Sequence, residues 1–367
     1  MEISSLHATK AKSPRLLGLD QARAVAILAM MVFHFAPGVF VQLPKLEPIR
    51  DPVLWFGRSA TPMFVTVFGV TVGFVFLPKY LRGEIAGTSR RLWRRALLIF
   101  FCSILITLPQ WIRLSVREHS TIWEWFFALY SVLLFYAIAL ALLPFWLRWL
   151  TKQSLARSLA GGVLLWVMGT LGYRLWPGGE QSLPEFFRMV LLSGDYGYLQ
   201  MMGTTLLAIP IGLRLRRLHD VGKEGPYLWQ LLIGGCLLAA FGAAWGWFLG
   251  EYDLARIIAG EMKIPPRPWY FLHFGSLAVV LLAGLEFLSR GVRVLSWPMY
   301  ILALCGQVSL VLYTGHLFVL PFLEVVGHFT SLKGLTRVLV AFVPFLIFCV
   351  VVVYGRHRQQ KVKPSVV

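Results

Sequence analysis

The pair of residues most able to do chemistry in this chain is Arg23 and His34, eleven positions apart in the apolar segment LDQARAVAILAMMVFHF. Eleven residues are almost three helical turns, so both side chains project from one face, about 16 Å apart along the axis. An ionisable side chain placed that deep in a membrane is costly and is a functional-site hypothesis by default. The spacing therefore predicts a polar track from one membrane surface toward the interior, as an enzyme needs if its two reactants come from opposite sides.

The elements that position this pair are transmembrane helices. Of 367 residues, 57% are hydrophobic and only 14% charged, whereas a soluble domain carries roughly 25% charged residues. We expect an all-α integral membrane protein, a bundle of about ten transmembrane helices. The stretches long enough to span a bilayer are 19–42, 52–77, 96–113, 122–147, 158–175, 198–213, 228–249, 270–289, 297–323 and 335–354.

The net charge of +18 is distributed over the loops in an alternating way. The N-terminus, every second loop and the C-terminus hold 22 of the 35 Lys and Arg, which is the positive-inside pattern with both termini cytoplasmic. We predict a cytoplasmic segment at 1–18, a single transmembrane domain at 19–354 and a basic cytoplasmic tail at 355–367. The basic loops suit anionic lipid headgroups or a CoA thioester, and we expect no nucleic-acid partner.

Each residue of the first helix also has a purely structural interpretation. Asp20 precedes Arg23 by three residues, so the two can form an ion pair. Arg23 could simply reach the inner headgroups, and His34 could hydrogen-bond a neighbouring helix. Their position on one face favours a functional role for both.

The LDQAR run at 19–23 followed by His34 resembles the opening of the membrane acyltransferase-3 family, which begins with an L-D-x-x-R-like segment and an Arg-x10-His spacing. The family also has around ten helices. The resemblance implies that His34 is essential for acyl transfer, and that Arg23, ordered by Asp20, lies on the path of the acyl donor.

The second helix resembles the family in part. Arg58, Phe64 and Gly69 follow its outline, but Phe68 stands where a serine is common. Arg58 is either an interfacial arginine or part of the active site. The segments TVGFVF and SRRLWRRALLIF resemble the OpgC-type branch, which is associated with succinylation of periplasmic glucans.

The ninth predicted helix carries Ser309, Tyr313 and His316 at i, i+4 and i+7, on one face. Late helices of the acyltransferase-3 family often have such a run, so the resemblance makes these three possible active-site residues. A structural hydrogen bond is the alternative for His316. Glu286 and Arg290, at i and i+4, are expected to form an ion pair.

Several other chemistries have no sequence support. The chain lacks a Walker loop, an HExxH zinc motif, a GxSxG elbow and a CxxC pair. The four cysteines fall within predicted spans and are expected to be buried apolar residues. We expect no metal and no permanently bound cofactor, with acyl-CoA serving as donor substrate.

These observations predict an O-acyltransferase of the bacterial inner membrane that interacts with membrane lipids. It would move an acetyl or succinyl group from cytoplasmic acyl-CoA to a hydroxyl of an envelope glycan or related acceptor. His34 would act as a general base or as a nucleophile that carries the acyl group. Arg58 or His316 would stabilise the oxyanion. The alternatives are a transporter that uses the Arg–His track and a structural membrane subunit; the absence of a clear internal repeat disfavours the transporter.

Overall fold

The computed structural model describes residues 15–115, 121–176, 178–193, 196–329 and 332–362, and within these ranges the chain is helical and contains no strand. The α-helices are α1 (Leu17–Gln42), α2 (Arg50–Arg58), α3 (Ala60–Thr71), α4 (Leu77–Leu81), α5 (Ile85–Ser115), α6 (Ile122–Ala128), α7 (Val132–Leu150), α8 (Leu155–Leu175), α9 (Leu183–Arg188), α10 (Tyr198–Asp220), α11 (Glu224–Phe248), α12 (Leu254–Ala259), α13 (Pro268–Gly291), α14 (Ser296–Gln307), α15 (Ser309–Phe329) and α16 (Gly334–Val362). The all-α class is as predicted.

In the described part of the chain, eight helical segments are long and apolar enough to cross a membrane. One of them is the run Pro44–Leu81, which includes α2, α3 and α4. A ninth is added if the bent pair α14–α15 counts as one span. The sequence predicted about ten. The difference is the segment 198–213, which forms α10 but is not apolar enough to qualify. Its last turns carry arginines, and its buried face includes Gln200, Thr204 and Thr205. The predicted span at 122–147 is divided into α6 and α7, and Ser131 caps the start of α7.

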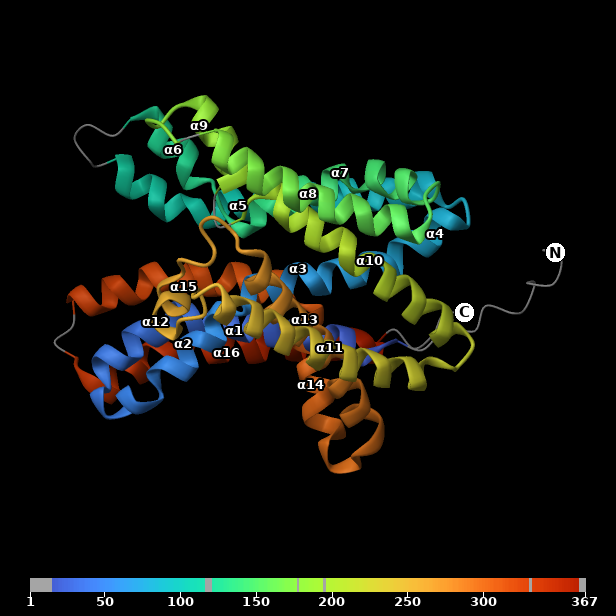
Figure 1. The fold of residues 1–367 in the computed structure, drawn as a ribbon. Coiled ribbons are helices and arrows are strands. Elements are labelled where there is room, and N and C mark those ends of the chain that lie inside the picture. The colour runs from blue at the N-terminus through green and yellow to red at the C-terminus, as the bar shows by residue number, and fades with distance from the viewer. Residues whose placement is uncertain (1–14, 116–120, 177, 194–195, 330–331, 363–367) are drawn as a thin grey trace, which may run out of the picture.

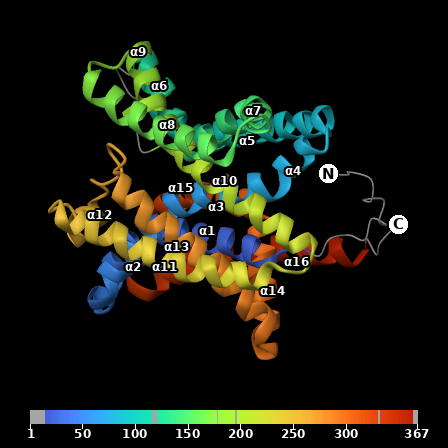
Figure 2. The same cartoon turned by 45° about the vertical axis from the view of Figure 1, so that its right-hand side comes forward.

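The helices form two groups (Figure 1, Figure 2). Helices α5 to α9 lie together on one side, and α1, α2, α11 to α13 and α16 lie on the other, with α3 and α10 between them. Helix α10 packs against α8 of the first group and against α3, and α3 packs against α1 and α13 of the second group. Together α3 and α10 therefore join the two groups through the interior.

The contact between α3 and α10 depends on glycine. A Cβ at Gly212 of α10 would overlap the carbonyl oxygen of Val70, and a Cβ at Gly73 would overlap that of Ile209. Gly73 lies in a π-helical turn, Val72–Phe76, that joins α3 to α4. Small residues let two backbones approach closely where lipid gives helices no hydrophobic reason to associate.

The start of α1 and the last turns of α16 lie at the same end of the bundle. Both contact α14, because Gln21 donates to the carbonyl of Met299 at 2.8 Å and Tyr300 hydrogen-bonds His357 at 3.1 Å. The charge pattern predicts that this end faces the cytoplasm, and we call it the inner end below.

Candidate active site

The two histidines singled out in the sequence meet in the interior. Nδ1 of His34 on α1 lies 2.8 Å from Nε2 of His316 on α15, and the rings are nearly parallel, 18° apart, with centroids separated by 5.1 Å. His316 is fully buried. The edges of Phe35 and Tyr313 contact its ring. The hydrogen bond uses one ring nitrogen of His34 and leaves its Nε2 for other partners.

His34 borders a small internal cavity, whereas His316 lies behind it. The cavity has a volume of about 120 Å³ and is enclosed by α1, α2, α3, α7 and the loops around Tyr196 and Lys263. Its lining residues are Met30, Phe33, His34, Gly57, Arg58, Ala60, Thr61, Val132, Tyr196 and Lys263. An imidazole, two cationic side chains, a phenol and a hydroxyl thus face one space.

Arg58, at the end of α2, is held rigidly beside this cavity. Its guanidinium stacks over the ring of Phe33, 4.0 Å from the centroid, and its Nε donates to the carbonyl of Ile258 at 2.6 Å. The hydroxyl of Tyr270 donates to the Arg58 carbonyl. The structure thus places Arg58 on the same cavity as His34, whereas His316 does not line it.

Lys263 is a cavity residue that the sequence analysis missed. It is buried although it lies in the loop between α12 and α13, and its Nζ lies 5.3 Å from the centre of the Tyr196 ring. Gly260, with φ of +88°, turns the chain after α12 so that this loop can reach inward. Nothing in the sequence distinguishes Lys263 from an ordinary loop lysine.

Arg23 and Asp20 form a second polar site nearer the inner end. Nη1 of Arg23 lies 3.2 Å from Asp20 and 3.4 Å from the carbonyl oxygen of Gly306, and Nη2 donates to Thr71 at 3.0 Å. Asp20 also pairs with Arg15 at 2.6 Å. The predicted i,i+3 ion pair is present, and Arg23 additionally ties α1 to α3 and α14.

Tyrosines occupy the interior between the two polar sites. Tyr136 on α7 packs against Phe64 and Phe68, and Tyr313 contacts His316. The Tyr136 hydroxyl is buried and has no hydrogen-bond partner among the described residues. No hydrogen bond of the described residues joins Arg23 to the histidine pair through these tyrosines.

Ser309 does not join this cluster. It is the first residue of α15, two turns and about 10 Å before His316 along the helix axis. Of the predicted Ser–Tyr–His run, Tyr313 and His316 are in contact, and none of the three lines the cavity.

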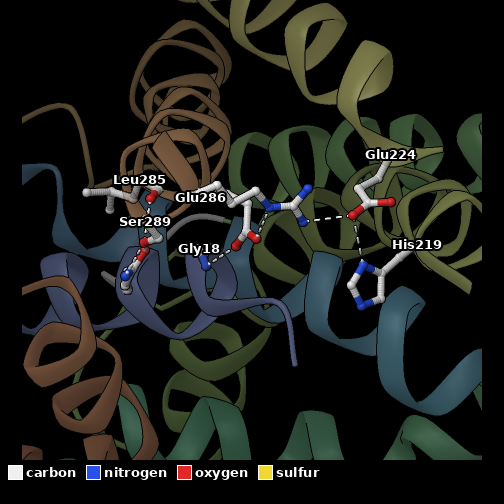
Figure 3. Close-up of polar contacts among 8 residues, drawn as sticks. Gly18, His219, Glu224, Leu285, Glu286 and Ser289 are labelled. Atoms are coloured by element: carbon white, nitrogen blue, oxygen red, sulfur yellow. Dashed lines mark hydrogen bonds and ion pairs between the residues drawn. The ribbon is translucent and has the colours of Figure 1, made fainter. Parts of the chain in front are cut away.

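A separate network at the inner end fixes the start of α1 (Figure 3). Glu286 accepts from the backbone N–H of Gly18 at 2.6 Å and from Arg290 at 2.8 Å. Arg290 also reaches Glu224, which contacts His219. The predicted pair of Glu286 and Arg290 is confirmed, and its additional bonds show a structural role that links α1, α10, α11 and α13.

Comparison with known proteins gives one match. The family model described as an acyltransferase domain matches residues 16–354. The searches of curated proteins and of solved structures returned no match. The matched range contains α1 with Arg23 and His34, α15 with His316, and every described residue of the cavity. The chain belongs to the acyltransferase-3 family of integral membrane acyltransferases.

Proposed function

We propose that this membrane acyltransferase takes an acetyl or succinyl group from cytoplasmic acyl-CoA and transfers it to a hydroxyl of an envelope glycan or related acceptor. The observation that supports this most directly is the hydrogen-bonded pair of His34 and His316 beside a cavity lined by cations. A bacterial inner membrane is the expected location, since such an enzyme needs the donor on one side and the acceptor on the other.

The pair also suggests how His34 is activated. The hydrogen bond between the two rings can run in either direction, depending on which nitrogen carries the proton. In the direction that serves catalysis, Nδ1 of His34 donates to Nε2 of His316, and the proton of His316 is on its Nδ1. Nε2 of His34 then carries no proton and can act as a base or as a nucleophile.

Two reactions use this nitrogen, and both balance. In the first, Nε2 of His34 removes the proton of the acceptor hydroxyl while the hydroxyl oxygen attacks the thioester carbonyl. The C–S bond then breaks, and the proton passes to the departing CoA sulfur. In the second, Nε2 itself attacks the thioester carbonyl, the C–S bond breaks, and CoA leaves as the thiolate while His34 becomes an acyl-imidazolium. The acceptor hydroxyl later takes the acyl group and loses its proton, which restores neutral His34 and balances the thiolate. The second reaction lets the acyl group move outward without CoA.

Arg58 and Lys263 are suited to stabilise the oxyanion that both reactions create. Both line the cavity that His34 borders. A fixed cation beside the developing charge lowers the barrier most in a site that excludes water. We therefore favour Arg58 over His316 for the oxyanion role, because His316 does not line the cavity.

Labelled acyl-CoA tests the proposal on the purified protein. We expect CoA release from acetyl- or succinyl-CoA and, if acyl-histidine forms, label on the peptide that contains His34. Flux of solute across vesicles without CoA release would instead favour the transporter alternative. The same assay with a panel of glycans would identify the acceptor.

Arg23→Lys tests the donor route separately from the chemistry. Lysine keeps the charge but loses the planar fork that reaches Asp20, Gly306 and Thr71 together. We expect KM for acyl-CoA to rise about tenfold, as for one lost charged hydrogen bond, with a smaller change in kcat. An unchanged KM would remove Arg23 from donor binding, and Arg50→Lys at an exposed ion pair is the matched control.

A further inference from the structure

A long apolar groove lies away from the histidine cavity. It has a volume of about 720 Å³ and is lined by residues of α8, α10, α11 and α13 and by Thr66 of α3. Along α11 the lining extends from Gln230 to Trp245, about 22 Å at the helical rise. That is longer than one leaflet of a bilayer whose hydrocarbon core is about 30 Å thick. The groove and the histidine cavity share no lining residue.

The groove opens onto surfaces that face lipid. Helices α8, α11 and α13 are candidate membrane spans. Val163, Val167 and Leu171 of α8 and Leu238 of α11 line the groove and are also exposed. An exposed apolar surface within a membrane-spanning segment contacts hydrocarbon chains, so the groove is continuous with the lipid-facing surface of the protein.

Cationic side chains lie just beyond the inner end of the groove. Arg214 comes one turn after Ile211, a lining residue of α10, and its guanidinium lies 4.7 Å from the ring centre of Tyr227. Tyr227 in turn comes one turn before Leu231, a lining residue of α11. Arg214 is therefore located where the apolar lining of both helices ends.

The turn between α10 and α11 adds to this positive charge. Arg217 and Lys223 are exposed there. Its two acidic residues are already engaged, since Asp220 pairs with Arg216 at 2.9 Å and Glu224 with Arg290 at 2.8 Å. A basic cluster beside an apolar crevice on the predicted cytoplasmic side matches the charge and shape of an anionic lipid.

We propose that this groove binds one anionic phospholipid of the inner leaflet, with its tails along α11 and its phosphate at Arg214. The positive charge of the basic cluster favours an anionic lipid over a helix from a second copy of the protein, because such a helix would place apolar residues beside the cations. The lipid fills the space between the two helix groups that α10 joins.

Gly234 offers a direct way to block the groove. It lines the groove, and a Cβ built there meets no heavy atom within 4 Å. The ring of Gly234→Phe would therefore occupy the groove rather than disturb the core. Cys236→Phe is the matched control. Contrary to the expectation that the cysteines are buried, Cys236 is exposed; it lies on the same helix and does not line the groove.

Native mass spectrometry of the full chain, titrated with dioleoyl-phosphatidylglycerol or dioleoyl-phosphatidylcholine, tests the proposal without acyl-CoA. We expect one tight phosphatidylglycerol site, which Gly234→Phe weakens at least tenfold and Cys236→Phe leaves unchanged. Arg214→Gln should weaken phosphatidylglycerol about fivefold, the contribution of one cation near the surface, and leave phosphatidylcholine unaffected. Equal affinities for the two lipids, undiminished binding by Gly234→Phe, or a dimer that Gly234→Phe dissociates would each overturn it.

Discussion

His34→Ala is expected to lower acyl transfer by at least about 10²–10⁴-fold, the range that a general base contributes, and to abolish it if His34 carries the acyl group. The loss should appear in kcat, because in the proposed mechanism the imidazole contacts the reacting atoms and not the distant parts of the donor. The measurement is CoA release by purified protein at saturating acyl-CoA.

His273 provides a matched control for that result. It is another buried histidine within a span, and its ring hydrogen-bonds the carbonyl of Ala239 away from the cavity. His273→Asn should retain turnover if removing a buried imidazole is not itself damaging. Normal turnover by well-folded His34→Ala would exclude His34 from the mechanism.

His316→Phe is expected to reduce kcat about 10²-fold while leaving KM for acyl-CoA nearly unchanged. Phenylalanine keeps a planar ring behind His34 but cannot form the hydrogen bond to its Nδ1. The variant therefore removes the contact that orients His34 and that, in the proposed mechanism, fixes its tautomer. The pH dependence of kcat should shift as well, because His34 loses a hydrogen-bonded neighbour. Loss of packing alone would leave the pH dependence of kcat unchanged.

A double variant separates the two roles of the pair. If His316 acts through His34, His316→Phe should add nothing to the effect of His34→Ala, since residues that act as a unit are strongly non-additive. Additive losses would show instead that His316 contributes independently, for example by contacting the acceptor.

Much of the fold could be predicted from local sequence, because a helix that spans a bilayer must be continuously apolar. Periodicity also predicted the contacts within one helix, such as Glu286 with Arg290. Periodicity could not predict that α10 would run inside the bundle. The arginines and buried threonines of α10 make this helix a poor membrane span, but the segment alone does not reveal which neighbouring helices shield it.

Some residues of the candidate site could likewise be predicted from the sequence, and others could not. His34 and His316 could each be selected, since an ionisable group in a span needs a reason. Their direct hydrogen bond joins residues 282 positions apart, and only helix packing brings them together. Lys263 could not be selected at all, because its burial results from how one loop folds back and not from its own sequence context.

The chain bends by 76° where α14 meets α15, and this break gives Arg23 a structural role besides the proposed contact with acyl-CoA. A helix interrupted within a membrane leaves carbonyls without intrahelical donors. One of them, at Gly306, is reached by the Arg23 guanidinium. Helix α15, which carries His316, begins directly after this joint. A substitution of Arg23 therefore removes a donor at the bend as well as the proposed contact with the acyl donor.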